Sequence, residues 1–191
     1  MSMFLRPTIT AFFFLLMALS ATRFSLAEDT KPANTPGGKI EVLLIDGQNN
    51  HDWKRCSPVM MTTLEATGRF EIEQATVSKS QVADFSPDFT KYDDVLSNYN
   101  GASWPEKTKA AFVKYIQNGG SLVVVHAADN SFPKWKEFNE MIGLGGWGDR
   151  NEKDGPYVYW KDGKIVRDDS KGRGGSHGSH WEYKVIVREK D

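Results

Sequence analysis

Two short segments consist almost entirely of β-branched and aliphatic residues, and they constrain the fold more than any other feature. They are Ile40–Ile45 and Ser121–Val125, and the second is followed directly by His126. Each has the length of a single strand and almost no polar residue to face water. Such a pattern is typical of strands covered on both faces, as in a parallel sheet flanked by helices.

The segments between and after these runs predict alternating helices and strands. Ser57-Pro58 is typical of a helix N-cap and first residue, and Ser103-x-x-Glu106 is a capping-box pattern. Further strands are expected at 70–76 and 92–98, and helices at 57–68, 103–118 and from 131 to 142. This order predicts an α/β fold with right-handed crossovers and helices on both faces of the sheet.

The chain after Gly143 has a different character, with many glycines. Tyr157–Trp160 and Lys164–Val166 flank Lys161-Asp162-Gly163, which predicts a β-hairpin. A Gly-rich loop is expected at 171–179, and the alternation in Trp181–Val187 predicts a last strand.

The N-terminus resembles a secretory signal peptide. Arg6 precedes the apolar stretch Ile9–Ala21, and Ser25-Leu26-Ala27 provides small residues for cleavage. An uncleaved membrane anchor is the alternative, which Arg23 and the cleavage site disfavour. We therefore expect a signal at 1–27, a polar linker at 28–38, one domain at 39–191, and a periplasmic or secreted protein that meets the membrane only during export.

Composition excludes several classes of protein. The formal net charge of −1 and the lack of a Lys/Arg cluster argue against a nucleic-acid partner. The single cysteine, Cys56, excludes an intrachain disulfide framework and a cysteine zinc ribbon. Cys56 also lies at a helix start rather than at a strand end, which makes thiolate acyl transfer a poor hypothesis.

Ligands of open parallel sheets bind beyond the carboxyl ends of the strands, so the residues there are the candidate site. His126 ends the most apolar strand and precedes Ala127-Ala128, where an imidazole could serve as a base, an electrophile or a metal ligand. The alternative is a histidine that only bonds the backbone at a strand end. A histidine after a run of valines favours the functional interpretation.

The loop after the first strand supplies a second group of candidates. His51 and Asp52 could form an imidazole–carboxylate pair, and Trp53 could offer a flat surface to a sugar. Asp52 as a helix cap and Trp53 as a packing residue are the alternatives. Asn98, at the end of the third strand, is a candidate to orient ligand hydroxyls.

His177 and His180 lie in or beside the Gly-rich loop. His177 is a candidate ligand-binding residue, with a mobile surface loop as the alternative, while His180 fits the loop better than a site. A metal-dependent hydrolase with His51, His126 and His177 as ligands is a third hypothesis, although no spacing specifies a metal.

Three segments together resemble the ThuA-like (trehalose utilisation) family. They are Val42–Asp46 with the following Asn49-Asn50-His51-Asp52-Trp53, the stretch Gly119–Ala128, and Gly174-Gly175-Ser176-His177-Gly178. The resemblance covers residues 39–187. It implies a flavodoxin-like three-layer fold of the class I glutamine amidotransferase-like superfamily. His126 stands where those enzymes carry their cysteine, so the resemblance does not imply amidotransferase activity.

The family's association with disaccharide breakdown through 3-keto-sugars implies a small carbohydrate ligand. The resemblance implies a role in the site for His126 directly, because it stands at the matching position. It implies such a role for His51 and His177 because they fall in matching segments, and less closely for Asp52 and Trp53. The expected function is acid–base breakdown of a glycoside or keto-sugar, with or without a divalent metal. A non-catalytic carbohydrate-binding or scaffold module is the alternative. Family domains continue beyond Asp191, so we expect this domain to be incomplete at its C-terminus.

Overall fold

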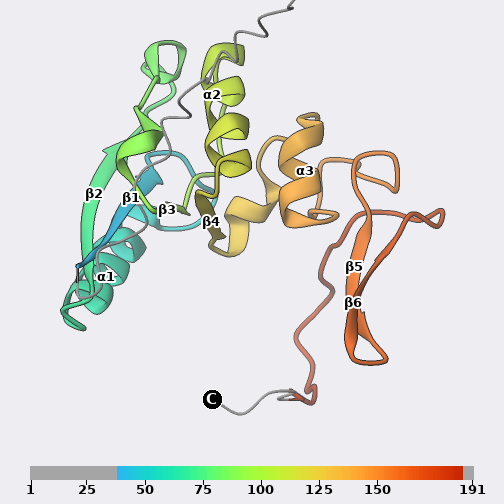
Figure 1. Ribbon diagram of the computed structural model, residues 1–191. Coiled ribbons are helices and arrows are strands. Elements are labelled where there is room, and N and C mark those ends of the chain that lie inside the picture. The colour runs from blue at the N-terminus through green and yellow to red at the C-terminus, as the bar shows by residue number, and fades with distance from the viewer. Residues whose placement is uncertain (1–37, 187–191) are drawn as a thin grey trace, which may run out of the picture.

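The computed structural model describes residues 38–186, and a four-stranded parallel sheet forms its centre (Figure 1). The strands are β1 (Ile40–Asp46), β2 (Phe70–Thr76), β3 (Asp94–Ser97) and β4 (Ser121–Val124), in the spatial order β2-β1-β3-β4. Every neighbouring pair runs parallel. This order matches the first four strands of a flavodoxin-like sheet, which confirms the predicted α/β fold.

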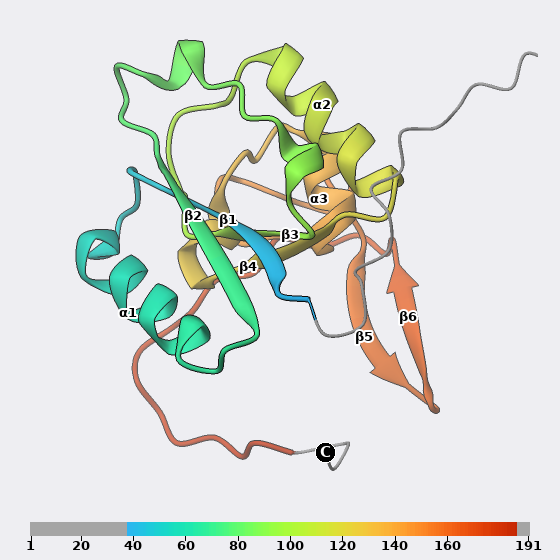
Figure 2. The same cartoon turned by 60° about the vertical axis from the view of Figure 1, so that its left-hand side comes forward.

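Alternation along β1 divides the core between the two faces of the sheet. Val42 and Leu44 pack with α1 (Trp53–Glu65), while Leu43 and Ile45 face the opposite side. On that side lie α2 (Glu106–Gln117) and α3 (Lys136–Ile142), as Figure 2 shows. A cluster of buried aromatic side chains packs between them and the sheet. Each apolar side chain buried there contributes roughly 1.5–3 kcal/mol to folding. The predicted coverage of both faces is confirmed.

Helix α1 begins five residues earlier than the Ser-Pro pattern predicted. Asp52 is its N-cap, with a side-chain oxygen that accepts a hydrogen bond from the backbone N–H of Arg55 at 3.3 Å. Pro58 therefore lies inside the helix. Ser57 is buried, and its hydroxyl accepts a bond from Asn98 Nδ2 at 3.0 Å instead of capping. The prediction was wrong because the serine has a distant partner in the loop after β3.

The predicted capping box at Ser103 and Glu106 does not form. Helix α2 starts at Glu106 after Pro105, and no side chain caps it. A residue before proline is disfavoured in the helical region, and here that residue is Trp104, which is buried in the aromatic cluster. Helix α3 also starts late, at Lys136, because Phe132 adopts a positive φ of 51°.

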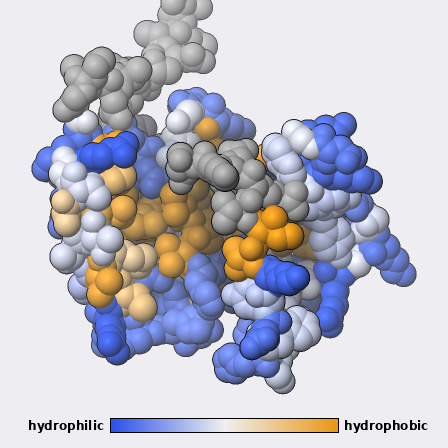
Figure 3. Space-filling view, turned by 90° about the horizontal axis from the view of Figure 1, so that it is seen from below, coloured by the Kyte–Doolittle hydropathy of each residue, from blue (hydrophilic) through white to orange (hydrophobic). Residues whose placement is uncertain are grey.

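Strand β4 is shorter and more exposed than its apolar sequence predicted. It ends at Val124, and His126 begins a short 3₁₀ helix, η3 (His126–Asn130). Leu122 and Val124 pack on the α2 side, so Val123 points to the α1 side, where it is 48% exposed. Among residues 38–186, β4 is an edge strand. Figure 3 shows apolar side chains gathered across the middle of the face seen from below.

The segment after α3 contains the predicted hairpin. Strands β5 (Tyr157–Lys161) and β6 (Lys164–Asp168) pair antiparallel around Asp162 and Gly163, whose φ angles are 51° and 79°. These angles suit the two-residue Asp-Gly turn. The predicted last strand is wrong over residues 181–186, which are exposed and form no regular structure. The alternating pattern finds no neighbouring strand there to bond.

Two further expectations concern the ends of the chain. The predicted signal at 1–27 and nearly all of the 28–38 linker lie outside the described residues. None of the helices within 38–186 has the length and apolar character needed to cross a membrane.

Candidate functional site

His51 and His126, which lie on loops after different strands, meet at the carboxyl edge of the sheet. Their ring centroids are 4.6 Å apart, and the rings are nearly perpendicular at 83°. His51 follows β1 and His126 follows β4, and both are exposed. The sheet order reverses between β1 and β3, and such a reversal is where ligands of open α/β sheets bind.

The loop that carries His51 is fastened to the loop after β3. Asn49 Nδ2 donates to the carbonyl oxygen of Asn98 at 3.1 Å and to its Oδ1 at 3.2 Å. Asn49 Oδ1 in turn accepts the backbone N–H of His51 at 3.0 Å. Asn100 Nδ2 adds a bond of 2.9 Å to Asn50 Oδ1. These short polar side chains fix the position of the His51 backbone without a helix or strand.

His126 has an unusual backbone conformation. Its φ is +45°, in the left-handed region that residues with a side chain seldom adopt. Such a conformation costs on the order of 1–3 kcal/mol and is concentrated at functional sites. The small Ala127 and Ala128 that follow are both buried, which permits the sharp change of direction. The imidazole is thereby turned out of the strand.

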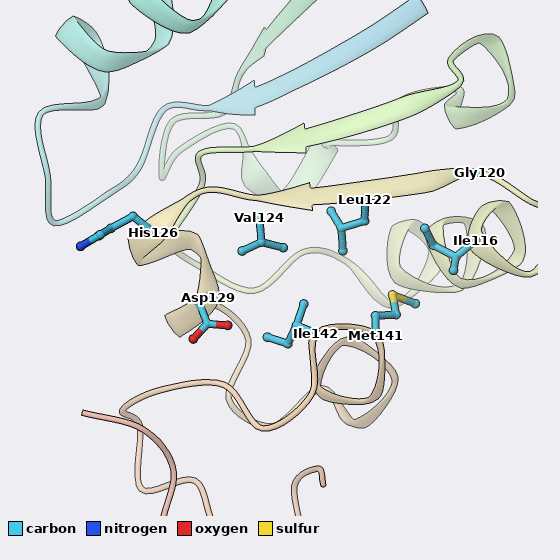
Figure 4. Close-up of a pocket in the computed structure, with 8 residues that line it drawn as sticks. All are labelled: Ile116, Gly120, Leu122, Val124, His126, Asp129, Met141 and Ile142. Carbon is cyan, nitrogen blue, oxygen red and sulfur yellow. The ribbon is translucent and has the colours of Figure 1, made fainter. Parts of the chain in front are cut away.

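A cavity of about 580 Å³ runs along β4 on the α2 and α3 side, with His126 and Asp129 at one end (Figure 4). Its volume lies in the range of small-molecule sites. Most of its lining is aliphatic: Ile116, Leu122, Val124, Met141 and Ile142, with Gly120. In Figure 4 the His126 ring points away from Val124 and Leu122. The polar chemistry is therefore confined to one end of the cavity.

Asp129 was not among the sequence candidates. It lies in η3, three residues after His126, and its Oδ2 accepts the backbone N–H of Gly146 at 3.0 Å. Gly145 passes so close that a Cβ there would lie 2.7 Å from the Asp129 carbonyl oxygen. The His-x-x-Asp spacing within one short turn was the signal that could have identified it.

Arg150, also missed by the sequence, fastens the segment after His126. It is only 2% exposed and donates four hydrogen bonds to oxygen atoms. The acceptors are Asn139 Oδ1 at 2.8 Å and the carbonyl oxygens of Asn130 at 3.1 Å, Gly146 at 2.5 Å and Ser131. Burial lowers the pKa of Arg150, and the charges of Asp129 and Asp154 oppose that shift. No local pattern marks this residue in the sequence.

Asp52 and Trp53 lie beside His51, at the start of α1. The Asp52 carboxylate caps the helix, as one of the two sequence interpretations held. Trp53 is partly buried, and the Lys54 ammonium lies 5.6 Å from the centre of its ring. Both residues follow His51 directly in the chain, and the Trp53 N–H donates to the His51 carbonyl oxygen at 2.8 Å.

Asn98 is buried and holds neighbouring segments together. It is 5% exposed, its Nδ2 donates to Ser57, and its Oδ1 accepts from Asn49. It links β3 to α1 and to the His51 loop, so the structure places it beneath the site rather than on its surface.

His177 lies against a different aromatic residue. Its ring centroid is 5.3 Å from that of Trp147, in an edge-to-face contact. Within residues 38–186, no three His, Cys, Asp or Glu side chains are grouped so that they could hold a metal ion. His51, His126 and His177 therefore do not fit the predicted metal site. His180 is exposed and lies in no helix or strand.

Comparison with known proteins gives a family and two solved structures. The sequence model of the family described as ThuA, trehalose utilisation, matches residues 41–180. A ThuA-like protein from Parabacteroides merdae is 51% identical, with a TM-score of 0.65 over 73% of this chain and 51% of that one.

A second ThuA-like protein, from Bacteroides uniformis, is 20% identical, with a TM-score of 0.43 over 63% of this chain and 53% of that one. The chain thus spans about half the length of these two proteins. A search of curated proteins finds no match.

Proposed function

This chain belongs to the ThuA (trehalose utilisation) family, and from that premise we propose that it breaks down a disaccharide or 3-keto-sugar by acid–base catalysis at His51 and His126. The observation that carries the proposal is the contact of these two rings, 4.6 Å apart, at the end of a cavity of substrate size. The whole relative is about twice as long, so the activity is proposed for the site and not taken over from the relative.

The histidine pair can supply both halves of a proton exchange. A neutral imidazole has one nitrogen that accepts a proton and one that donates. In glycoside hydrolysis, a base takes a proton from the attacking water and an acid gives one to the departing glycosidic oxygen. We assign the base to His126, which lines the cavity, and the partner role to His51.

The neighbouring residues have supporting roles in this proposal. Asp52 and Asn98 position the His51 loop, Trp53 borders the bound sugar, and Asp129 lies beside His126 at the polar end of the cavity. We derive no step through a divalent metal, because the three histidines of the metal hypothesis are not grouped together.

We also propose that the protein is exported from the cytoplasm. This proposal rests on the signal-like pattern of residues 1–27. Mass spectrometry of protein recovered from its native compartment tests it. A mature N-terminus at Glu28 is the expected result, and retention of residues 1–27 would contradict export.

A turnover assay paired with calorimetry on the same sugars tests the catalytic proposal. The purified chain is supplied with trehalose, related disaccharides and their 3-keto derivatives, and product is measured. We expect His126→Ala to abolish turnover without loss of folding, while the exposed His180→Ala serves as a matched control. Binding without product in the unaltered protein would favour a carbohydrate-binding module, and undiminished turnover in His126→Ala would remove His126 from the mechanism.

A further inference from the structure

Trp147 exposes a large apolar ring beside the candidate site. It is 47% exposed, whereas Trp104 and Trp135 are buried in the core. Trp160 and Trp181 are also exposed, at 41% and 80%, so it is the backbone conformation of Trp147 that distinguishes it from them.

The backbone that carries Trp147 is strained and firmly braced. Trp147, Gly148 and Asp149 all have left-handed φ angles, of 59°, 62° and 56°. The Trp147 N–H donates to the Gly175 carbonyl oxygen at 2.9 Å, and its own carbonyl accepts from the Arg150 N–H at 3.2 Å. Residues with side chains adopt this conformation at a cost, which persists where the surroundings enforce it. The fold therefore holds an exposed tryptophan in place at a cost to stability.

The same segment is joined to the polar end of the cavity. The residue before Trp147 is Gly146, whose N–H donates to Asp129 Oδ2 at 3.0 Å. Asp129 and His126 line that end of the cavity together. Trp147 is thus the chain neighbour of a residue that bonds the polar end of the cavity.

His177 supports the indole from its edge. The two rings meet edge to face at 77°, with centroids 5.3 Å apart. His177 Nδ1 lies 3.2 Å from the carbonyl oxygen of Gly178. In the tautomer that donates this bond, Nε2 is left as a hydrogen-bond acceptor. An apolar ring face beside a ring-nitrogen acceptor matches the two kinds of surface on a sugar ring, its C–H face and its hydroxyl groups.

We infer that Trp147 and His177 form a stacking subsite for a pyranose ring, next to the histidine pair. The inference rests on the proposed function, since it names the surface that holds the second sugar of a disaccharide. Trp147 offers the flat face, and His177 fixes the orientation of the indole and accepts from a hydroxyl. In this proposal the aliphatic residues that line most of the cavity do not stack on the sugar ring.

Calorimetric titration with trehalose and with methyl α-glucoside tests the subsite. We expect Trp147→Ala to weaken trehalose binding about tenfold or more, a difference of about 1.4 kcal/mol. Trp147→Phe, which keeps an aromatic face, should retain most of the affinity, and His177→Ala should lose part of it. The matched control is Trp160→Ala, since Trp160 on β5 is similarly exposed at 41%.

Three results would overturn the inference. They are native affinity in Trp147→Ala, an equal loss of affinity in Trp160→Ala, and no binding of either sugar to the unaltered protein. Circular dichroism checks the fold of each variant, and Trp147→Phe with His177→Ala decides the matter if the alanine variant unfolds. His126→Ala separates the two proposals. Binding that depends on Trp147 without any turnover refutes only the catalytic proposal, and turnover with a KM insensitive to Trp147 refutes only the subsite.

Discussion

The imidazoles of His51 and His126 meet edge to face, with ring centroids 4.6 Å apart, although one follows β1 and the other follows β4. Strand β3 lies between those two strands in the sheet, so both loops must reach across its carboxyl end. Two local features hold the rings in contact. Asn49 Oδ1 accepts the backbone N–H of His51, and the left-handed backbone of His126 turns its ring out of the strand. We expect the two histidines to act as one functional unit.

The role of Asp52 can be separated into capping and catalysis. Asp52→Ala removes the N-cap of α1 and should lower the free energy of unfolding by about 1 kcal/mol. Asp52→Asn keeps a capping oxygen, so it should retain nearly all of that stability. We expect Asp52→Asn also to retain turnover, measured on the same sugars. A large loss of turnover in a stable Asp52→Asn variant would show that the carboxylate charge takes part in the reaction.

The four hydrogen bonds that Arg150 donates should contribute strongly to stability. Arg150→Ala leaves the acceptors of four hydrogen bonds without their donor, and a buried group left unpaired costs about 1–3 kcal/mol. We therefore expect a loss of about 3 kcal/mol or more in urea unfolding. Arg167→Ala is the control, because Arg167 is exposed and donates one bond of 3.3 Å to the carbonyl of Glu140. Equal midpoints for the two variants would show that these hydrogen bonds contribute little.

Alkaline pH should destabilise the protein through its buried tyrosines. Burial raises the pKa of Tyr99 and of Tyr115 to about 12 from an ordinary value of 10. Between these values the unfolded chain releases the phenolic protons while the folded chain retains them, so the free energy of unfolding falls as pH rises from 10 to 12. Below pH 10 both states are protonated and this contribution is constant.

Thermal unfolding between pH 8 and 12 measures that slope. Tyr115→Phe removes one of the two titrating hydroxyls, so it should reduce the loss of Tm above pH 10. The variant should stay folded, because the hydroxyl bond that it loses, to the Ser121 carbonyl, is long at 3.2 Å. Tyr183→Phe, at an exposed position, should leave the slope unchanged. An identical slope in all three proteins would mean that Tyr115 does not titrate in this range.

The sheet could be predicted from sequence because its signals are local. Residues 40–45 and 70–76 have strand patterns of the right length, and the Asp162-Gly163 turn defines the hairpin by itself. The helix starts could not be predicted, because distant partners decide them. Ser57 bonds Asn98 instead of capping α1, and the buried Trp104 before Pro105 delays α2.

The candidate site was predicted in part for the same reason. His51 and His126 could be identified because strand ends mark the ligand edge of a parallel sheet. Asp129 had one local signal, its spacing from His126, whereas Trp147 and Arg150 had none, since their positions depend on contacts among η3, α3 and the Gly-rich loop. The placement of Asn98 beneath the site likewise depends on its partners Ser57 and Asn49.

A double-mutant cycle in kcat/KM tests the central claim most directly. His51→Ala, His126→Ala and the double variant are assayed on the sugar that the unaltered protein turns over best. General acid–base groups contribute on the order of 10²–10⁴-fold, so each single variant should fall by about a hundredfold or more. Groups that act as a unit are strongly non-additive, and the double variant should be no worse than the poorer single variant. Unchanged kcat/KM in either single variant, or losses that multiply in the double variant, would contradict the account.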